Sequence, residues 1–164
     1  MQGEQVEADK KKGIDLMEKA ANAGNKTAAS NMSLAYRKGD GVEVNIEKSI
    51  EWAIKAAELG DDDRIFQYAV AYFNGEDPVT EDKAKAVEFF VLAANAGSST
   101  AMENLGVCYN NGYGVALDKN KAIEWFEKAA KEGGFKKAMD NLEDLYPEVD
   151  ASTSQTRYFE LVKA

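Results

Sequence analysis

Few residues of this chain could do chemistry. Its 164 residues include no histidine and a single cysteine, Cys108, so the most common general base and the most common metal ligand are both missing. A cysteine nucleophile needs a neighbouring group that favours its thiolate. We therefore interpret Cys108 as an inert, partly buried helix residue. One cysteine also cannot form an internal disulfide, so folding does not depend on an oxidising compartment.

Two short motifs superficially suggest ligand sites. The acidic run Asp61–Asp63 lacks the alternating ligands and the final glutamate of a calcium loop, and acidic residues are also favoured at helix N-termini. The glycine pairs Gly39/Gly41 and Gly112/Gly114 lack the preceding strand and the Gly-Lys-Ser/Thr ending of a phosphate-binding loop. We interpret the first motif as a helix start and the glycine pairs as turns.

A column of side-chain amides repeats along the chain, and we call it the amide column: Asn31, Gln67, Asn104 and Asn141. An amide both donates and accepts, so the column can pair with the backbone of an extended peptide whatever its sequence. Alternatively, the amides are solvated or bond within their own helices. Both interpretations stay open at this point.

Apolar residues accompany the amide column and predict an apolar strip, with Arg37 at one end: Leu34, Phe66, Val70, Phe73 and Val107. Phe66, Val70 and Phe73 lie on the side of one predicted helix opposite to Tyr68 and Tyr72, where the fold alone does not demand aromatic residues. The strip is either open to a partner or partly buried by curling of the chain. Together, the column and the strip are our candidate partner-binding site.

The elements that must position these residues follow from a repeat. The pattern Ala-Ala-x-x-Gly ends at Gly24, Gly60, Gly97 and Gly133, at steps of 36, 37 and 36 residues. A fixed period in this range predicts a solenoid in which each unit buries its apolar face against its neighbours. We predict an all-α solenoid of antiparallel helix pairs. Its first helices are expected at 26–38, 61–74, 98–111 and 135–146.

The second helix of each pair is expected to begin after an N-cap residue: Asp9, Asn45, Asp82 or Asp118. Large side chains follow at one position, four residues before each alanine pair: Leu16, Trp52, Phe89 and Trp125. Core packing against the small alanines explains them better than a ligand cage does. In the second loop, Pro78 replaces a turn glycine, and we expect Asp77 to tolerate a left-handed conformation there.

The stretch from Ala101 to Gly133 carries the motif A-x-x-x-L-G-x-x-Y-x-x-G-x-G-V-x-x-D-x-x-K-A-x-x-W-F-x-K-A-A-x-x-G almost complete. It resembles the Sel-one-like repeat (SLR), a relative of the tetratricopeptide repeat, over residues 3–146. Earlier units depart from it, with Ser33 and Ala69 in place of Gly106. The resemblance implies a right-handed superhelix whose first helices line a concave face. Members commonly act as adaptors or scaffolds that hold other proteins, share no catalytic activity, and are often bacterial.

The predicted organisation is a half repeat at 1–24, full repeats at 25–60, 61–97 and 98–133, a half repeat at 134–146, and a capping segment at 147–164. Because Gly3, Val6 and Asp9 fit the spacing of the later loops, residues 1–9 are expected to end a loop whose preceding helix is missing. The chain is then a fragment that has lost any targeting segment, or a native start that happens to fit. Past Pro147, residues 157–164 are expected to form a short capping helix or a flexible tail.

Charge and composition narrow the function. Lys and Arg number 20 against 29 Asp and Glu, a net charge of −9, which disfavours a nucleic-acid surface. No apolar run approaches the roughly 20 residues of a membrane helix. We predict a non-catalytic interaction module without a cofactor, which holds a peptide or a partner helix in its groove. A structural spacer and a carboxylate-based hydrolase are the alternatives, and the compartment stays open between cytoplasmic and secreted or periplasmic.

Overall fold

A computed structural model describes residues 2–149, 160, 161 and 163, without the side chains of residues 2–8, 135 and 147–149. The described part is helical, with no strand between residues 2 and 149. Its helices are α1 (Gln2–Asn22), α2 (Lys26–Lys38), α3 (Ile46–Glu58), α4 (Asp63–Asn74), α5 (Lys83–Asn95), α6 (Ser99–Asn111), α7 (Lys119–Lys131) and α8 (Phe135–Val149). The predicted all-α class is confirmed, and α2 has the predicted bounds.

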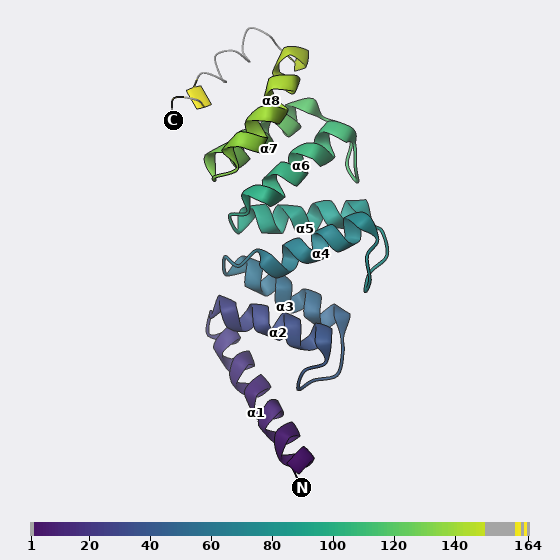
Figure 1. Ribbon diagram of the computed structural model, residues 1–164, viewed down its shortest axis with the longest axis vertical. Helices are drawn as coiled ribbons and strands as arrows, with labels where there is room; N and C mark the ends of the chain where they lie inside the picture. The colour runs from purple at the N-terminus through teal and green to yellow at the C-terminus, as the bar shows by residue number, and fades with distance from the viewer. Residues whose placement is uncertain (1, 150–159, 162, 164) are drawn as a thin grey trace.

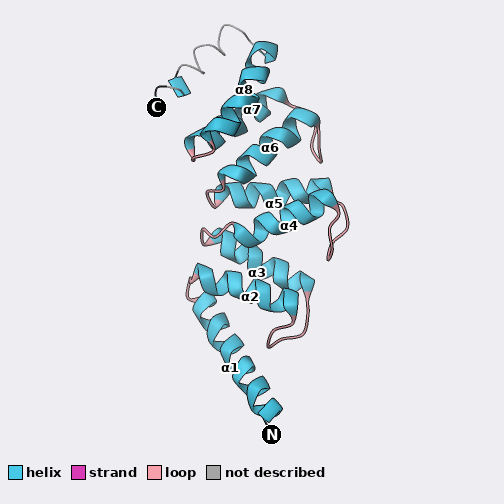
Figure 2. Ribbon diagram, viewed as in Figure 1, coloured by secondary structure: helices cyan, strands magenta, loops and turns pink. Residues whose placement is uncertain are grey.

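The helices stack in chain order along the long axis of the molecule, with α1 at one end and α8 at the other (Figure 1). Short turns and longer loops join them alternately (Figure 2). Each helix packs on its neighbours in sequence, and α2 also contacts α4 as α3 contacts α5. This one-dimensional stacking is the solenoid that the repeat predicts. We refer to residues 25–60, 61–97 and 98–133 as units one, two and three.

Side-chain caps start the second helices of the three full units. Asn45, Asp82 and Asp118 are extended residues whose Oδ1 atoms accept from the backbone N–H three residues on, at 2.8, 2.9 and 3.0 Å. The loop before each cap also returns to the preceding helix; the N–H of Asn45, for example, donates to the carbonyl of Tyr36 at 2.9 Å. Three of the four predicted caps are confirmed.

The fourth predicted cap, Asp9, is wrong. Helix α1 runs without interruption from Gln2 to Asn22, so Asp9 lies inside it and the expected loop over residues 1–9 is helix from Gln2 onward. The capped loops of the full units are held by hydrogen bonds to a preceding first helix. The residues before Asp9 belong to α1 itself, and the good helix formers around Asp9 continue this helix. The N-terminal half of α1 extends beyond the stack (Figure 1).

Glycines end the first helices as expected. Gly39, Gly75 and Gly112 follow α2, α4 and α6 with φ values of 76°, 70° and 72°, a left-handed conformation that glycine adopts without strain. The second loop differs from its prediction. No described residue other than glycine has a positive φ, so Asp77 is not left-handed, and the Asp77–Pro78 peptide is cis.

The predicted column of large side chains lies only partly in the core, where Phe89 is 5% exposed. Trp52 and Trp125 of the same column are half-buried and Leu16 is 65% exposed, whereas Phe90 and Phe126, each one residue after a predicted position, are almost fully buried. Lys55 and Lys128 lie over the two tryptophan rings, 4.9 and 4.2 Å from the ring centroids. The assignment of the predicted column to the core is therefore confirmed for Phe89, wrong for Leu16, and only partly correct for Trp52 and Trp125.

The last helix of the solenoid also ends later than predicted. Helix α8 continues to Val149, so its expected end at Tyr146 is wrong by about a turn. Of the predicted capping segment, residues 150–159, 162 and 164 lie outside the described residues. Leu161 is 8% exposed and belongs to the main apolar cluster, as a cap over the last unit requires.

Candidate functional site

The candidate residues lie on one helix per unit, and we call the surface that carries the amide column the first-helix face. Asn31 lies on α2, Gln67 on α4, Asn104 on α6 and Asn141 on α8. Asn31 and Gln67 are exposed, and Asn104 and Asn141 are half-buried. The repeat therefore positions one amide on each successive first helix.

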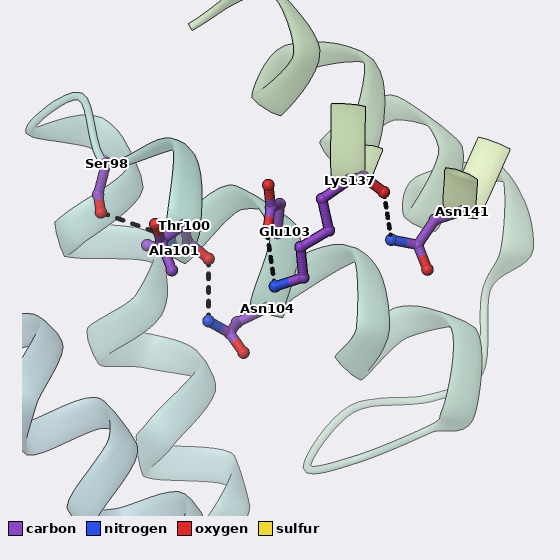
Figure 3. Close-up of polar contacts among 7 residues, drawn as sticks. All are labelled: Ser98, Thr100, Ala101, Glu103, Asn104, Lys137 and Asn141. Carbon is purple, nitrogen blue, oxygen red and sulfur yellow. Dashed lines mark hydrogen bonds and ion pairs between the residues drawn. The ribbon is translucent and has the colours of Figure 1, made fainter. Parts of the chain in front are cut away.

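Two of the amides are held by their own helices. The Nδ2 atoms of Asn104 and Asn141 donate to the carbonyls of Thr100 and Lys137, each at 2.9 Å (Figure 3). The interpretation that the amides bond within their own helices is therefore correct for this pair. One N–H of each amide is used in this way, and both Oδ1 atoms point away from the carbonyls that the amides bind (Figure 3). An acceptor in a fixed orientation is thus presented by two successive units.

Gln67 has a different environment. Its Oε1 accepts from the Nη1 atoms of Arg37 and Arg64, at 3.4 and 3.2 Å. The guanidinium carbon of Arg37 also lies 5.9 Å from the centroid of the Tyr68 ring. The amide column is therefore interrupted by positive charge between α2 and α4.

The apolar strip is half-buried along its length: Leu34, Phe66, Val70, Phe73 and Val107. The rings of Phe66 and Phe73 pack on Phe90 with centroid distances of 5.8 and 6.3 Å, and Phe73 also meets Tyr113 at 5.7 Å. The expectation that the fold does not demand these phenylalanines is wrong, because both contribute to the packing of α4 on α5. They still expose part of their surface.

The opposite end of the face carries a paired charge. Glu103 on α6 is only 7% exposed, and its Oε2 lies 2.8 Å from the Nζ of Lys137 on α8 (Figure 3). A carboxylate at this depth requires such a partner. This pair joins the third unit to the last helix.

The only cysteine of the chain is buried. Burial raises the pKa of the Cys108 thiol to about 11, and the residue is 1% exposed, so it stays protonated and shielded near neutral pH. Between residues 2 and 149, no group of three or more His, Cys, Asp or Glu side chains is placed to hold a metal ion. No helix in the same range is long and apolar enough to cross a bilayer.

Sequence reasoning missed two features. The first is Arg64, which stands where the other first helices carry Ala28, Ala101 and Ala138. This exception in a column of alanines was the available signal. The second feature is an open pocket of about 660 Å³ beside the unit-two loop, lined in part by Ile46, Tyr72, Pro78 and Val79.

The third loop shows why the pocket lies beside unit two. A Cβ at Gly114 would lie 2.2 Å from the carbonyl oxygen of Lys83, so this loop sits directly on the first turn of α5. The second loop carries Pro78 and an extra residue where the third has that glycine. Its altered sequence was the signal for the pocket.

Comparison with known proteins agrees with this architecture. The family model of the Sel1 repeat matches residues 1–25, 27–61, 65–98 and 99–134. The chain belongs to the Sel1 repeat family. The predicted resemblance to Sel-one-like repeats is thereby confirmed. None of the curated proteins compared with the chain matches it significantly.

Solved structures of Sel1 repeat proteins are similar to it. A Sel1 repeat protein of Oxalobacter formigenes is 34% identical, with a TM-score of 0.62 over 80% of this chain and 98% of that one. A protective antigen of uropathogenic Escherichia coli with an SLR fold is 27% identical, with a TM-score of 0.60 over 92% of this chain and 33% of that longer one. Cysteine-rich protein B of Helicobacter pylori is 26% identical, with a TM-score of 0.53 over 82% and 96%.

The family bounds the function. Sel1 repeat proteins are generally protein-interaction scaffolds, and their fold is typically non-catalytic. The family therefore suggests protein partners for this chain. The Helicobacter relative is named for its cysteines, whereas this Sel1 chain contains a single cysteine, so no internal disulfide can join its repeats.

Proposed function

We propose that this Sel1 chain is a non-catalytic interaction module that binds an extended peptide segment of a protein partner along its first-helix face. The observation that carries the proposal is the orientation of the column amides. Asn104 and Asn141 each spend one N–H on their own helix and keep Oδ1 and a second N–H free for a ligand. A peptide backbone presents both donors and acceptors, so it can pair with such groups without regard to its side chains.

The apolar strip supplies the remaining contact. Because Phe66 and Phe73 also pack on Phe90, a partner would meet their exposed edges instead of whole rings. Val70 lies between them on α4, and Leu34 on α2 and Val107 on α6 are half-buried as well. Aromatic anchors of this kind commonly dominate binding, and polar neighbours set the register. Nucleic acid is disfavoured as the ligand by the net charge of −9.

Catalysis does not enter this proposal. The thiol of Cys108 has a pKa raised to about 11 by burial, and the chain has no histidine to act as a base. A binding role needs neither group. A partner helix could occupy the same surface, but it has no free backbone N–H groups for the amide oxygens, so we favour an extended segment.

A peptide selection tests this function. Peptides are selected from a random linear-peptide phage library on the immobilised full chain, and their affinities are measured by fluorescence anisotropy. Asn104→Ala should weaken binding by roughly two- to tenfold, the contribution of one or two neutral hydrogen bonds. Asn120→Ala, the same change at an exposed position on α7, is the matched control and should leave affinity unchanged. If no peptide is selected, or if both variants bind alike, the first-helix face is not the binding surface.

A further inference from the structure

Two guanidinium groups converge on one neutral acceptor between α2 and α4. Arg37 lies in the last turn of α2 and Arg64 in the first turn of α4. Their Nη1 atoms both donate to Oε1 of Gln67, at 3.4 and 3.2 Å. Two like charges are therefore held near one another by an oxygen that carries no formal charge. We call these two residues the arginine pair.

No carboxylate neutralises the arginine pair within the part of the chain that the structure describes. The ion pairs of this part join lysines to acids, as in Lys10–Asp40 and Lys137–Glu103. Acidic residues outnumber basic ones by 29 to 20, so a scarcity of acids does not explain it. The nearby acid Asp61 turns its Oδ1 toward the backbone N–H of Asp63, at 3.3 Å.

The position of Arg64 makes its charge costly to leave unpaired. Its counterparts in the other units are the buried alanines Ala28, Ala101 and Ala138, so the side chain leaves its helix at a helix–helix contact. The Nε atom of Arg64 is buried and has no hydrogen-bond partner. A buried donor without an acceptor, beside a second cation, is destabilising until an anion approaches.

We propose that the arginine pair is a carboxylate site that binds an Asp or Glu side chain within the partner peptide. A guanidinium presents planar, forked donors that match the two oxygens of a carboxylate, and charge-assisted bonds of this kind are the strong ones. Gln67 occupies one Nη1 of each arginine, which leaves further donors on both groups. The Tyr68 ring, 5.9 Å from the guanidinium carbon of Arg37, helps to orient that group.

The place of the pair favours a side-chain carboxylate over a peptide C-terminus. This step rests on the proposed function, in which a peptide follows the amide column. Gln67, which bonds to both arginines, is itself a member of the column, and the column continues to Asn31 on α2 and to Asn104 on α6. A peptide that contacts both must pass the pair with its interior, where only a side chain can supply the carboxylate. The pair then sets the register of an otherwise sequence-tolerant groove.

The first test addresses the site without a peptide. The full chain is titrated with N-acetyl-glutamate amide while the Nε–Hε resonances of Arg37 and Arg64 are followed by NMR; N-acetyl-glutamine amide is the neutral isostere, and phenyl phosphate represents a phosphate ligand. We expect saturable shifts with the glutamate compound alone. Arg64→Ala, which restores the residue of the other units, should weaken the response at Arg37 by about tenfold or more. Lys38→Gln removes a neighbouring charge and should leave it unchanged.

Contrary outcomes are distinct. Equal responses to the glutamate and glutamine compounds, or equal losses in Arg64→Ala and Lys38→Gln, would show general charge effects and overturn the site. Tighter binding of phenyl phosphate would replace the carboxylate with a phosphate ligand and overturn the assignment as well.

A second test separates the site from the proposed function. Phage peptides selected on the full chain should be enriched in Asp or Glu at one position, and peptides selected on Arg64→Ala should lack that enrichment. Peptides that bind along the column without any acidic preference would contradict the site and leave the proposed function standing. Enrichment at the peptide C-terminus would overturn the commitment to a side chain. A positive titration with no selected peptide would instead contradict the proposed function.

Discussion

Units one and three solve the same packing problem by different chemistry. In unit one, Ser33 of α2 and Ser49 of α3 are buried together with Tyr68 of α4; we call these residues the serine cluster. At the equivalent positions of unit three and α8 stand Gly106, Ala122 and Leu142, where the structure shows only apolar contact. One interface is joined by hydrogen bonds and the other by close packing.

The serine cluster is internally satisfied. The hydroxyl of Ser49 donates to the Ser33 carbonyl at 2.6 Å, and Tyr68 OH donates to Ser49 Oγ at 2.7 Å. Because the one proton of Ser49 is already used, the contact between the two serine hydroxyls at 3.2 Å has Ser33 as its donor. Such bonds have a fixed direction, so they hold α2, α3 and α4 in one arrangement without filling much volume.

The interface of unit three works by volume. A Cβ at Gly106 would lie 2.6 Å from the Phe126 ring, so the absence of a side chain on α6 is what admits the aromatic on α7. In unit one the matching residues are Ser33 and Ala53, a larger residue opposite a smaller one. In unit three, the residue at position 106 and the ring at position 126 are therefore coupled, and a change at one of them alone is expected to be unfavourable.

The largest expected effect is at the aromatic of unit three. Phe126→Ala should reduce the free energy of unfolding by about 3–5 kcal/mol, because it opens a cavity at a position that is 1% exposed. Trp125→Ala, at the adjacent half-buried position, is the control and should cost clearly less. Urea titration followed by circular dichroism measures both. Equal losses of unfolding free energy would mean that Trp125 and Phe126 contribute equally to the core. The packing of unit three would then not depend on Phe126 in particular.

A double-mutant cycle tests the coupling. Gly106→Ala should destabilise the protein by about 1–3 kcal/mol, since the new methyl group overlaps the Phe126 ring. In a Phe126→Ala background the same change should stabilise it by up to roughly 1 kcal/mol, because alanine is the better helix former. This reversal of sign is the decisive outcome. If Gly106→Ala changes the free energy of unfolding in the same direction in both backgrounds, the overlap with the Phe126 ring is not what requires glycine at this position.

The polar interface should respond more weakly. Tyr68→Phe removes the hydrogen bond to Ser49 without a change of shape and should cost about 1 kcal/mol. Tyr72→Phe, one turn further along α4 and half-buried against Phe89, is the matched control and should be close to neutral. If both substitutions are neutral in urea titration, the serine cluster fills space and its hydrogen bonds contribute no net stability.

The helices were predictable because a repeat with alanine columns and cap residues is a local property of the chain. The bounds of α2, for example, coincide with their prediction at 26–38. Asp9 shows the limit: its spacing matched the other caps, but a cap of this kind also needs a preceding helix to hold its loop, and no spacing rule contains that condition. The assignment of Trp125 to the core was only partly correct for a related reason. Trp125 and Phe126 are adjacent aromatic residues that point to different sides of the helix, and the sequence alone does not say which of the two faces the core.

The candidate site was predictable in position but not in chemistry. The amide column lies on successive first helices as expected. The bonds that Gln67 receives depend on the side-chain conformations of Arg37 and Arg64, of which the former is 30 residues distant. Periodicity says which positions share a face. It does not say which side chains will find acceptors there.

The smallest expected effect is a pH dependence at the first loop. Asp40 accepts a hydrogen bond from Lys10 Nζ at 2.7 Å, and this bond, with the charge of Lys10, holds the pKa of the Asp40 carboxyl below its ordinary value of 3.8. In unit three the equivalent residue is Tyr113, whose ring packs on Phe73. At this position too, unit one makes a polar contact and unit three an apolar one.

Because the pKa of Asp40 is lowered in the folded state, the contribution of the ion pair to stability is fully present above about pH 4 and is lost as the pH falls through the folded value. Lys10→Met should therefore unfold slightly more easily than the parent chain at pH 7, and the difference should shrink toward zero in acid and in high salt. Lys12→Met, an exposed change on the same helix, should show no such trend. A difference that persists below pH 3 would assign the effect to the packing of the lysine stem and not to the ion pair.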